Sequence, residues 1–438
     1  MGLTIGIIGA GKSATVLIQY LQKNAVQNDW YILLADGDLD LAKNKWNNAS
    51  NGEAIGIDIE NEAARQQLVQ KADILVSMLP ANLHFLVAKD CLLLEKPLFT
   101  ASYVDDNMRS LAAAIKAKGL LFLCEMGLDP GIDHMSAMAI IDEVHAKGGK
   151  ITSFKSHCGG LVAPESDDNP WHYKISWNPK NIILAGKAGA IYLEKGATQT
   201  KEYTEIFNQA PIVDIPGIGP LAYYPNRNSL SYIDTYQLQG VNEFVRTTLR
   251  YPAFCSGWNA IVQLQLTDET ELDIAPNTTI QNWLNQHIQQ QGLASKLAQF
   301  MQDPSIQKQL EFIGLFDTTL IPPQYKTNAN ILQWLLEDKW KLKATDKDLV
   351  VMLHEIEYTI GSNRFKIDSS MVLTGDDAIH TAMAKTVGLP LAMSVCAYLK
   401  GEINLTGLHI PIDARIYQPI LKNLEEEGIV FQETLTAY

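Results

Sequence analysis

The chain has 438 residues, 47% of them hydrophobic, which is enough for two or three domains with apolar cores. Its formal net charge of −14 argues against nucleic acid and anionic membranes as partners. Five scattered cysteines, no CxxC pair, no apolar run of membrane length and no basic leader before the first strand predict a cytoplasmic protein with reduced thiols.

The first part of the chain alternates short apolar strands with helical segments. Residues 3–8 (LTIGII) and 30–35 (WYILLA) have the composition of buried parallel strands. Further strands are expected at 73–80 and 120–126, and helices at 60–71, 82–95 and 105–118. This alternation predicts an α/β fold with a doubly wound parallel sheet of the Rossmann type. We assign this dinucleotide-binding domain to residues 1–125.

Beyond residue 150 the pattern changes to strand-like segments separated by Pro-, Gly- and Asn-rich connections. Residues 348–373 read as a long hairpin that turns at Gly361-Ser362-Asn363. We therefore expect a second domain of the α+β type with a mostly antiparallel sheet that binds the substrate. Its expected ranges are 126–276 and 346–376, with a helical insertion at 277–345 and a C-terminal segment, 377–438, that packs back on the first domain.

The sequence GAGKSA follows the first strand directly and matches the GxGxxA pattern of dinucleotide-binding loops. The first glycine permits a tight turn, the second lets the backbone approach a pyrophosphate, and the alanine allows close helix–strand packing. The N-terminus of the following helix offers N–H groups to the phosphates. An ordinary strand–turn–helix is the alternative. The predicted cofactor-binding residues here are Gly9, Ala10, Gly11, Lys12, Ser13 and Ala14.

Asp36 closes the second strand, 22 positions after Ala14. A carboxylate at this place accepts hydrogen bonds from the adenosine ribose and repels a 2′-phosphate. No Arg or Lys occurs in the next four residues, so the sequence favours NAD(H) over NADP(H). At the end of the strand DILVSMLP, main-chain groups of Met78, Leu79 and Pro80 are expected to face the cofactor.

Arginine is scarce, with seven among the 35 Lys and Arg residues, yet Arg227, Arg246 and Arg250 fall within 24 positions. A guanidinium can bind a carboxylate through two parallel hydrogen bonds, so the cluster of three arginines favours an anionic substrate. Surface salt bridges are the alternative for any one of them.

Residues 157–179 (HCGGLVAPESDDNPWHYKISWNP) are too rich in Gly, Pro and Asn for regular structure. Long ordered loops of this kind often line a site. His157, Cys158 and His172 lack the spacing of metal ligands, and we expect no metal site.

Nine blocks in chain order carry a family resemblance, namely VSMLPANLHFLVAK, TASYV, GLDPGIDHM, HCGGLVAPE, NPWHYKISW, YYPNRNS, TLRYP, IGLF and AMAKTVGLP. With them the chain resembles the glutamate-forming saccharopine dehydrogenases, also called saccharopine reductases. The blocks span about 80 to 390, and with the N-terminal motif the likeness covers nearly the whole chain. It implies a Rossmann domain, a substrate domain containing a sheet, and a helical insertion.

The resemblance implies an oxidoreductase of lysine metabolism that acts on a CH–NH donor. A secondary amine is oxidised by loss of hydride from the carbon shared with the glutamate or the lysine-derived moiety, and water hydrolyses the resulting imine. With saccharopine the products are glutamate and 2-aminoadipate semialdehyde; the reverse reductive condensation is open. The partner is a small amino-acid substrate, and a homodimer is compatible with the family.

Site residues also follow from the resemblance, position by position. Tyr103, Asp129 and Cys158 match family residues near the reacting centre, and the first two are also expected to touch the substrate. A packed aromatic for Tyr103 and a small buried hydrophobe for Cys158 are the alternatives. Arg227 and Arg250 match arginines expected to bind substrate carboxylates. Further implied contacts are Ser102 and Leu128 for the cofactor, and Gly159 and Gly160 for the substrate.

The sequence departs from the family pattern at three places. NADP-using members have a basic residue after the second strand, where this chain has Asp36-Gly37, which supports NAD. The family's CGGLPAPE is CGGLVAPE here, and its NPLGYKFSW is NPWHYKISW. Trp171 and His172 therefore replace smaller groups and are expected to change the substrate pocket. A carboxynorspermidine-type dehydrogenase of the same family and a non-catalytic NAD-binding sensor remain alternatives.

The stretch GLDPGIDHM precedes a predicted helix that ends at Gly148-Gly149. Asp129 followed by Pro130 predicts a helix cap with proline at the first helical position. Asp133 and His134, in the first turn, are expected to support the geometry of the site and not to bind a metal.

Overall fold

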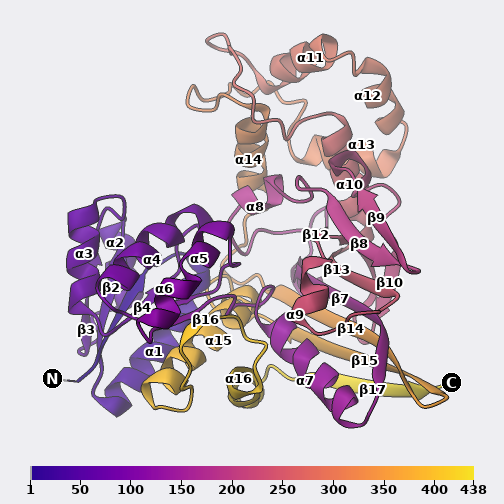
Figure 1. Cartoon of the computed structure of the whole chain (residues 1–438). Helices are drawn as coiled ribbons and strands as arrows, with labels where there is room; N and C mark the ends of the chain where they lie inside the picture. The colour runs from indigo at the N-terminus through magenta and orange to yellow at the C-terminus, as the bar shows by residue number, and fades with distance from the viewer. Residues whose placement is uncertain (1) are drawn as a thin grey trace. The chain divides into compact units, whose positions relative to one another are not determined.

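The computed structural model describes residues 2–438, and the chain forms two compact units (Figure 1). One unit comprises Met1–Gly148 and Ile379–Val430, and the other comprises Gly149–Ala378 and Phe431–Tyr438. By its internal contacts the first unit also includes the helix α7 (Ile132–Ala146), which follows the expected end of the dinucleotide-binding domain at residue 125.

The strands of the first unit are β1 (Thr4–Ile8), β2 (Tyr31–Asp36), β3 (Gly52–Gly56), β4 (Ile74–Ser77), β5 (Leu98–Thr100), β6 (Leu121–Leu123) and β16 (Gly407–His409). They form one sheet in the order β16-β6-β5-β4-β1-β2-β3, and every pair is parallel. After β3 the chain crosses to the other side of β1, which creates the switch point where doubly wound sheets bind ligands. The predicted Rossmann-type fold is confirmed.

The helices of this unit are α1 (Thr15–Asn28), α2 (Leu39–Trp46), α3 (Glu62–Lys71), α4 (His84–Leu93), α5 (Asp106–Ser110), α6 (Ala112–Ala117), α7, α15 (Ala382–Leu399) and α16 (Ala414–Glu426). Strands β1 and β4 lie at the centre of the sheet. They are short apolar runs because a central strand that is covered on both faces buries all of its side chains. Apolar side chains of these strands pack with those of α3 and α4 in one core. The core holds the carboxyl ends of the strands in place.

The C-terminal part of the chain divides between the units. Helix α15 packs against α1, α16 packs against α7, and β16 extends the parallel sheet beside β6. The last strand, β17 (Gln432–Ala437), instead pairs with the sheet of the second unit. The expectation that 377–438 as a whole packs on the first domain is therefore wrong for its final residues.

Within residues 2–438, α15 is long and apolar enough to cross a membrane by length and composition, with a mean hydropathy of 1.4. Of this helix, 78% is buried inside the fold, as in the core helix of a globular unit. Lys385 interrupts its apolar run, which is why the sequence pattern did not single it out.

The strands of the second unit are β7 (Lys150–Val162), β8 (Ala190–Glu194), β9 (Ala197–Lys201), β10 (Ile212–Ile215), β11 (Gly219–Pro225), β12 (Arg227–Asn228), β13 (Glu243–Arg250), β14 (Asp348–Ile360), β15 (Asn363–Thr374) and β17. The main order is β10-β11-β13-β7-β14-β15-β17, with β8, β9 and β12 beside it. Most pairs are antiparallel, whereas β7 and β13 run parallel. The predicted hairpin is formed by β14 and β15.

Strand β7 continues through the glycines of a segment that the sequence analysis placed in a loop. The strand has thirteen residues, of which 153–158 pair with β13, and it pairs with β14 along most of its length, including Gly159 and Gly160. A side chain at Gly159 would meet the carbonyl oxygen of Leu249 at 2.6 Å. Glycine is therefore required by the close approach of β13, and it does not end the strand.

Helices of the second unit are α8 (Lys180–Ile183), α9 (Ser231–Thr235), α10 (Pro252–Gln263), α11 (Ile280–Gln290), α12 (Ala294–Phe300), α13 (Pro304–Phe312) and α14 (Asn328–Lys339). Those from α11 to α14 lie in the predicted helical insertion. Their apolar faces enclose a core that includes Trp171, Trp258 and Trp340, each essentially without solvent exposure.

Candidate active site

The loop after β1 has the geometry of a dinucleotide cradle. Gly9 has a φ of +107°, and a side chain there would meet the carbonyl oxygen of Met78 at 2.9 Å. At Gly11 an added methyl group would have no heavy atom within 4 Å, so the backbone at this point is open to an approaching group. A single turn of 3-10 helix, Lys12–Ala14, then leads into α1. The geometry of these residues fits a pyrophosphate, and their contacts with a cofactor stay a prediction.

Asp36 lies at the end of β2, and both oxygens of its carboxylate accept backbone hydrogen bonds. Oδ2 accepts from the N–H of Ala10 at 2.6 Å, and Oδ1 accepts from the N–H of Asp38 at 2.9 Å. The carboxylate therefore ties the end of β2 to the glycine-rich loop. This is a structural role in shaping the loop.

Tyr103 and Asp129 form a direct contact in the first unit. The hydroxyl of Tyr103 donates a hydrogen bond of 2.8 Å to Oδ1 of Asp129. Both side chains are partly exposed, and they lie beyond the carboxyl ends of β5 and β6. This is the edge at which a doubly wound sheet places its ligands.

The loop that carries Asp129 closes on itself. Gly127 N–H donates to the carbonyl of Pro130 at 2.9 Å, and Ile132 N–H donates to the carbonyl of Gly127 at 2.8 Å. Gly131 has a φ of +147°, a conformation that side-chain-bearing residues rarely adopt. The loop thus presents Asp129 at its tip.

The predicted helix cap at Asp129 is wrong. Helix α7 begins at Ile132, its N-cap residue is Gly131, and the Asp129–Pro130 segment precedes it. The carboxylate of Asp133 accepts a hydrogen bond of 2.6 Å from the N–H of Gly131. Asp133 therefore accepts a backbone hydrogen bond at the start of the helix, the role that was expected for Asp129. The side chain of Asp129 instead contacts Tyr103.

The segment that carries Tyr103 is anchored on both sides by buried groups. Ser102 Oγ lies 2.6 Å from Nε2 of His84, whose Nδ1 lies 2.7 Å from Ser77 Oγ. Burial lowers the pKa of His84 to about 4, so its ring is neutral at pH 7. Val104 N–H donates to Oε1 of Glu125 at 2.9 Å. Tyr103 sits between these two fixed points.

The remaining predicted cofactor contacts lie at the same edge of the sheet. Met78 N–H donates to the carbonyl of Ile8 at 2.8 Å, and Pro80 precedes a single 3-10 turn, Ala81–Leu83. Leu128 is 5% exposed, in the loop that carries Asp129. Leu79 packs at the margin of the sheet's core. Their contacts with a cofactor stay predictions.

In the second unit, Cys158, Gly159 and Gly160 lie consecutively on β7. Cys158 is buried, with Thr248 of β13 and Met352 of β14 at its two sides in register. All five cysteines of the chain are buried, and none of them forms a disulfide in the described structure.

Arg250 ends β13 beside these residues. Its Nη1 donates to the carbonyls of Leu249 at 2.8 Å and Gly160 at 3.4 Å. The guanidinium lies 5.4 Å from the ring centres of Tyr173 and of Phe254. The residue is 6% exposed, and its buried Nε has no hydrogen-bond partner in the described structure. A buried cation with an unused donor is suited to a carboxylate ligand.

The other two arginines of the cluster differ from Arg250. Arg227 is exposed in the short strand β12, with a φ of 52°. Arg246 is 7% exposed, and its guanidinium lies 4.3 Å from the ring centre of Tyr232. Although the three arginines are close in the sequence, they therefore lie in different surroundings in the structure.

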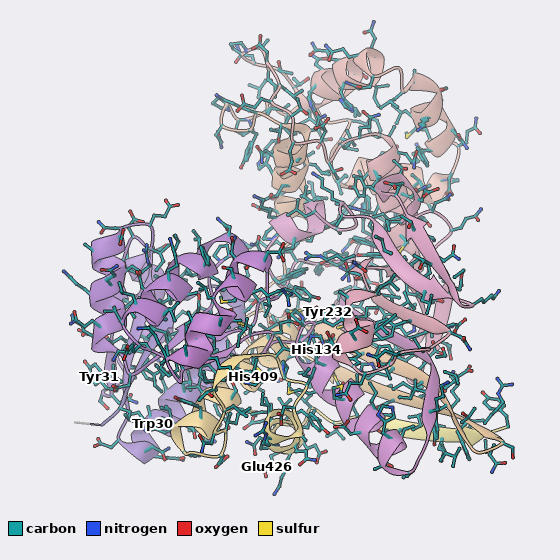
Figure 2. The ribbon with its side chains drawn as sticks, viewed as in Figure 1. Trp30, Tyr31, His134, Tyr232, His409 and Glu426 are labelled. Atoms are coloured by element: carbon teal, nitrogen blue, oxygen red, sulfur yellow. The ribbon has the colours of Figure 1, made fainter. Side chains whose placement is uncertain are left out.

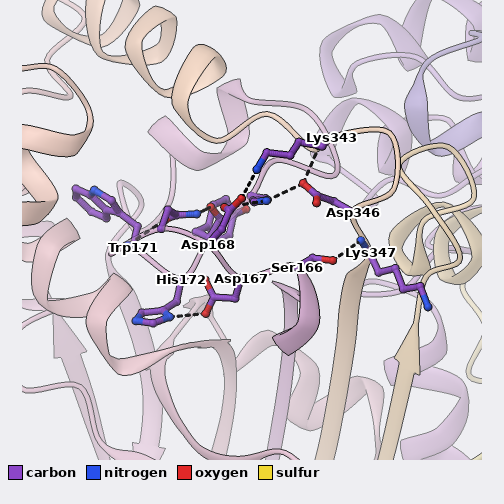
Figure 3. A network of polar contacts seen from close by, with 11 residues as sticks. Ser166, Asp167, Asp168, Trp171, His172, Lys343, Asp346 and Lys347 are labelled. Carbon is purple, nitrogen blue, oxygen red and sulfur yellow. Dashed lines mark hydrogen bonds and ion pairs between the residues drawn. The ribbon is translucent and has the colours of Figure 1, made fainter.

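The expectation that Trp171 enlarges a group in the substrate pocket is wrong. Trp171 is fully buried in the aromatic core, and its Nε1 donates to the carbonyl of Gln309 at 2.8 Å. His172 is half exposed and pairs with Asp167. The neighbouring Lys174 joins Asp168 at 2.9 Å and Asp346 at 2.6 Å. Figure 3 shows Asp168 and Asp346 of this network together with Lys343, which contacts both.

This ion-pair network ties residues 166–174 to the start of β14, so the segment is a packed part of the unit. A hollow of about 810 Å³ beside it is lined mainly by charged residues of the network, of the end of α14 and of the chain that follows, and it includes no predicted site residue. Among residues 2–438, no three His, Cys, Asp or Glu side chains gather in a group that could hold a metal ion.

Two buried residues of the site region, His84 and Glu125, were not predicted from the sequence, and a third, His134, was predicted without a contact partner. His84 and Glu125 were not singled out, although each is a polar residue within or directly after an apolar run. His134 was expected to support the site, and the structure places its Nε2 2.8 Å from Oε2 of Glu125. Unpaired polar groups in an apolar run are costly, and that is the signal that marks such residues.

Comparisons with known proteins match both parts of the chain. The family model of the saccharopine dehydrogenase NADP binding domain matches residues 5–123, and that of the saccharopine dehydrogenase C-terminal domain matches residues 127–429. The structure of apo histidine-tagged saccharopine dehydrogenase (L-Glu forming) from Saccharomyces cerevisiae aligns with a TM-score of 0.89 and 28% identity, covering 99% of this chain and 100% of that one.

Curated relatives agree. Saccharopine dehydrogenase (NADP(+), L-glutamate-forming) of Pyricularia oryzae is 33% identical over 93% of this chain and 94% of its own length. The protein of the same name from Saccharomyces cerevisiae is 31% identical over the full length of both. Alpha-aminoadipic semialdehyde synthase of Arabidopsis thaliana is 32% identical over 93% of this chain, which spans only 41% of that longer relative.

The prediction that NAD is the main cofactor is wrong. Three relatives carry NADP(+) in their names, and the family model that matches the first unit is an NADP binding domain. The physical reason lies in Asp36, whose carboxylate accepts hydrogen bonds from the backbone N–H of Ala10 in the glycine-rich loop and from that of Asp38 just after β2. These hydrogen bonds explain an aspartate at position 36 without a contact to ribose, so Asp36 does not identify the cofactor.

Proposed function

We propose, because the chain belongs to the saccharopine dehydrogenase family, that it oxidises saccharopine with NADP(+) and releases L-glutamate. The family supports an oxidoreductase function for the chain. The substrate, the cofactor and the reaction are our proposal.

In the proposed reaction saccharopine, NADP(+) and water give L-glutamate, 2-aminoadipate semialdehyde, NADPH and a proton. Hydride leaves the carbon that joins the bridging nitrogen to the lysine-derived chain, and the C–N bond becomes a C=N bond. Water adds to this carbon, the C–N bond breaks, and the bridging nitrogen leaves with glutamate. When bound on the loop Gly9–Ala14, NADP(+) supplies the hydride acceptor.

The observation that carries the proposal is the hydrogen bond between Tyr103 and Asp129. Each stage of the reaction moves a proton to or from the amine or water, and a positioned side chain is needed for it. The Tyr103 hydroxyl can exchange a proton with the bridging nitrogen, and Asp129 can hold the proton or stabilise the positive charge that develops on that nitrogen. The reverse condensation uses the same groups.

Arg250 supports the choice of a substrate rich in carboxylates. Its guanidinium is buried beside two aromatic rings, and its Nε has no hydrogen-bond partner in the described structure. We assign to it one carboxylate of saccharopine, and we place Cys158, Gly159 and Gly160 beside the same substrate group. A carboxynorspermidine-type substrate carries fewer carboxylates and would leave this cation without a ligand.

The proposal is tested with the purified full-length chain, saccharopine and NADP(+), by following the absorbance of the reduced nicotinamide. The account predicts turnover that depends on both compounds. A parallel assay contains L-glutamate, 2-aminoadipate semialdehyde and NADPH, and turnover in either assay supports the proposal. Absence of turnover in both assays, with a folded protein that binds NADP(+), contradicts it and favours a non-catalytic nucleotide-binding role.

A further inference from the structure

The first unit contains two buried carboxylates and a buried histidine that contact the two segments carrying Tyr103 and Asp129. Glu125 follows β6 and is 4% exposed, and Asp133 is 1% exposed. His134, which is labelled in Figure 2, lies on α7 and is fully buried. Removing charged groups from water is costly, and replacement by apolar groups of similar size is often no less stable. Three such groups at one place therefore call for a function beyond stability.

Glu125 is bound to the segment of Tyr103 through both its backbone and its side chain. Its N–H donates to the carbonyl of Ser102 at 3.1 Å, and its Oε1 accepts from the N–H of Val104 at 2.9 Å. These two contacts lie on either side of Tyr103. Glu125 also has a φ of 59°, which is uncommon for a residue with a side chain. The conformation turns its carboxylate back toward the Tyr103 segment.

His134 connects this carboxylate to the loop of Asp129. Its Nε2 lies 2.8 Å from Oε2 of Glu125, and its Nδ1 lies 3.7 Å from Oδ2 of Asp133. The other oxygen of Asp133 accepts from the N–H of Gly131 at 2.6 Å. A chain of polar contacts thus runs from Val104, next to Tyr103, to Gly131, in the loop that presents Asp129.

We propose that Glu125 and His134 are positioning residues that hold the Tyr103 hydroxyl at hydrogen-bond distance from Asp129. They fix the two segments that carry this pair, and they touch neither reacting atoms nor substrate. A rigid second layer of this kind sets the geometry of groups that transfer protons, and a displacement of about 1 Å can cost about 10²-fold in rate. This inference rests on the proposed function only where turnover is measured.

The first test does not require turnover. Fluorotyrosine is placed at position 103, and its fluorine resonance is recorded in the full-length chain, in Glu125→Ala and in Asp90→Asn. Asp90 is a matched control, because it is a buried carboxylate of the same unit that pairs with Arg65. We expect the resonance to move in Glu125→Ala and to stay in place in Asp90→Asn. An unchanged resonance in folded Glu125→Ala overturns the inference.

The second test is a double-mutant cycle of Glu125→Ala and Tyr103→Phe, with kcat as the readout. We expect Glu125→Ala to lower kcat about 10²-fold with an unchanged KM for NADP(+), and to lower it less than about twofold when Tyr103→Phe is already present. Equal losses in both backgrounds would show that Glu125 acts independently of Tyr103 and would overturn the inference. Wild-type protein without turnover bears on the proposed function alone.

Two further variants separate positioning from loss of folding. Glu125→Gln keeps an acceptor for the N–H of Val104 and is expected to have most of the wild-type kcat. His134→Asn removes the contact with Glu125, and in the double-mutant cycle with Tyr103→Phe it is expected to give the same result as Glu125→Ala. If Glu125→Ala does not fold, the resonance and the cycle are measured with His134→Asn. A normal resonance and a normal kcat in His134→Asn contradict the inference.

Discussion

Tyr103 and Asp129, 26 residues apart in the sequence, meet in a hydrogen bond of 2.8 Å beyond the carboxyl ends of β5 and β6. Neither strand could place the pair alone. Tyr103 lies in a segment fixed by His84 and Glu125, and Asp129 lies at the tip of a loop that closes between Gly127 and Gly131. The contact therefore depends on two loops that the parallel sheet brings to one edge.

Tyr103→Phe removes only the hydroxyl of this contact. If that hydroxyl carries the proton, kcat with saccharopine should fall by about 10²–10⁴-fold, while the KM for NADP(+) changes little. Steady-state kinetics measures both. Tyr31→Phe is the control, because Tyr31 is 40% exposed at the start of β2. Equal kcat values for Tyr103→Phe and the wild type would remove Tyr103 from the proton-transfer step.

Arg250→Ala removes the buried guanidinium that we assign to a substrate carboxylate. A hydrogen bond to a charged group contributes about 1.5–3 kcal/mol, so KM for saccharopine should rise by about 10–100-fold. The affinity for NADP(+), measured by fluorescence titration, should stay the same. Arg364→Ala is the control, since the Arg364 side chain is 70% exposed and 3.9 Å from Glu357. An unchanged KM in folded Arg250→Ala contradicts the assignment.

His84 should make the first unit sensitive to acid. Burial lowers its folded-state pKa from 6.5 to about 4, and Asp105 opposes the shift. Between these values the unfolded chain takes up a proton that the folded chain does not, so stability present above about pH 6.5 is lost as the pH falls toward about 4. The loss is up to about 3 kcal/mol. Urea unfolding of His84→Gln should show a flatter dependence over this range; the same slope as in the wild type would contradict the shift.

Trp171 should contribute to stability and not to substrate binding. Because it is fully buried between the rings of the aromatic core, Trp171→Ala should lower the free energy of unfolding by about 3–5 kcal/mol. His172→Ala, at the neighbouring half-exposed position, should change it by less than about 0.5 kcal/mol. Denaturant unfolding measures both. A normal stability with a changed KM for saccharopine in Trp171→Ala would return the residue to the substrate pocket.

The parallel sheet was predictable from β1, β2, β4 and β6, which are apolar runs separated by helical segments. Its other strands, β3, β5 and β16, were not predicted, because they are short and β3 (GEAIG) is not an apolar run. The hairpin of β14 and β15 was predictable from its alternation and from Gly361 at the turn. Strand β7 was harder to predict, because Gly159 and Gly160 usually mark a turn. Here Gly159 is required by the approach of the Leu249 carbonyl, a contact between distant segments that no local pattern shows.

The candidate site was predictable in part. The glycine-rich loop has a local signature, and Arg250 stood out in the arginine cluster as well as in the resemblance. The site roles of Tyr103, Asp129 and Cys158 came from the resemblance alone. Asp36 misled the choice of cofactor, because a carboxylate at a strand end can serve ribose or the backbone equally well. His134 was expected to support the site, but its partner Glu125 was not predicted, since the two residues meet through a tertiary contact.

The most direct test of the proposed function follows the bridging nitrogen of saccharopine. Saccharopine with a heavy nitrogen isotope at this position is incubated with the protein and NADP(+), and the products are identified by mass spectrometry. The account predicts that the label appears in glutamate, in equal amount to the NADPH formed. Label in lysine, with 2-oxoglutarate as the second product, would contradict it.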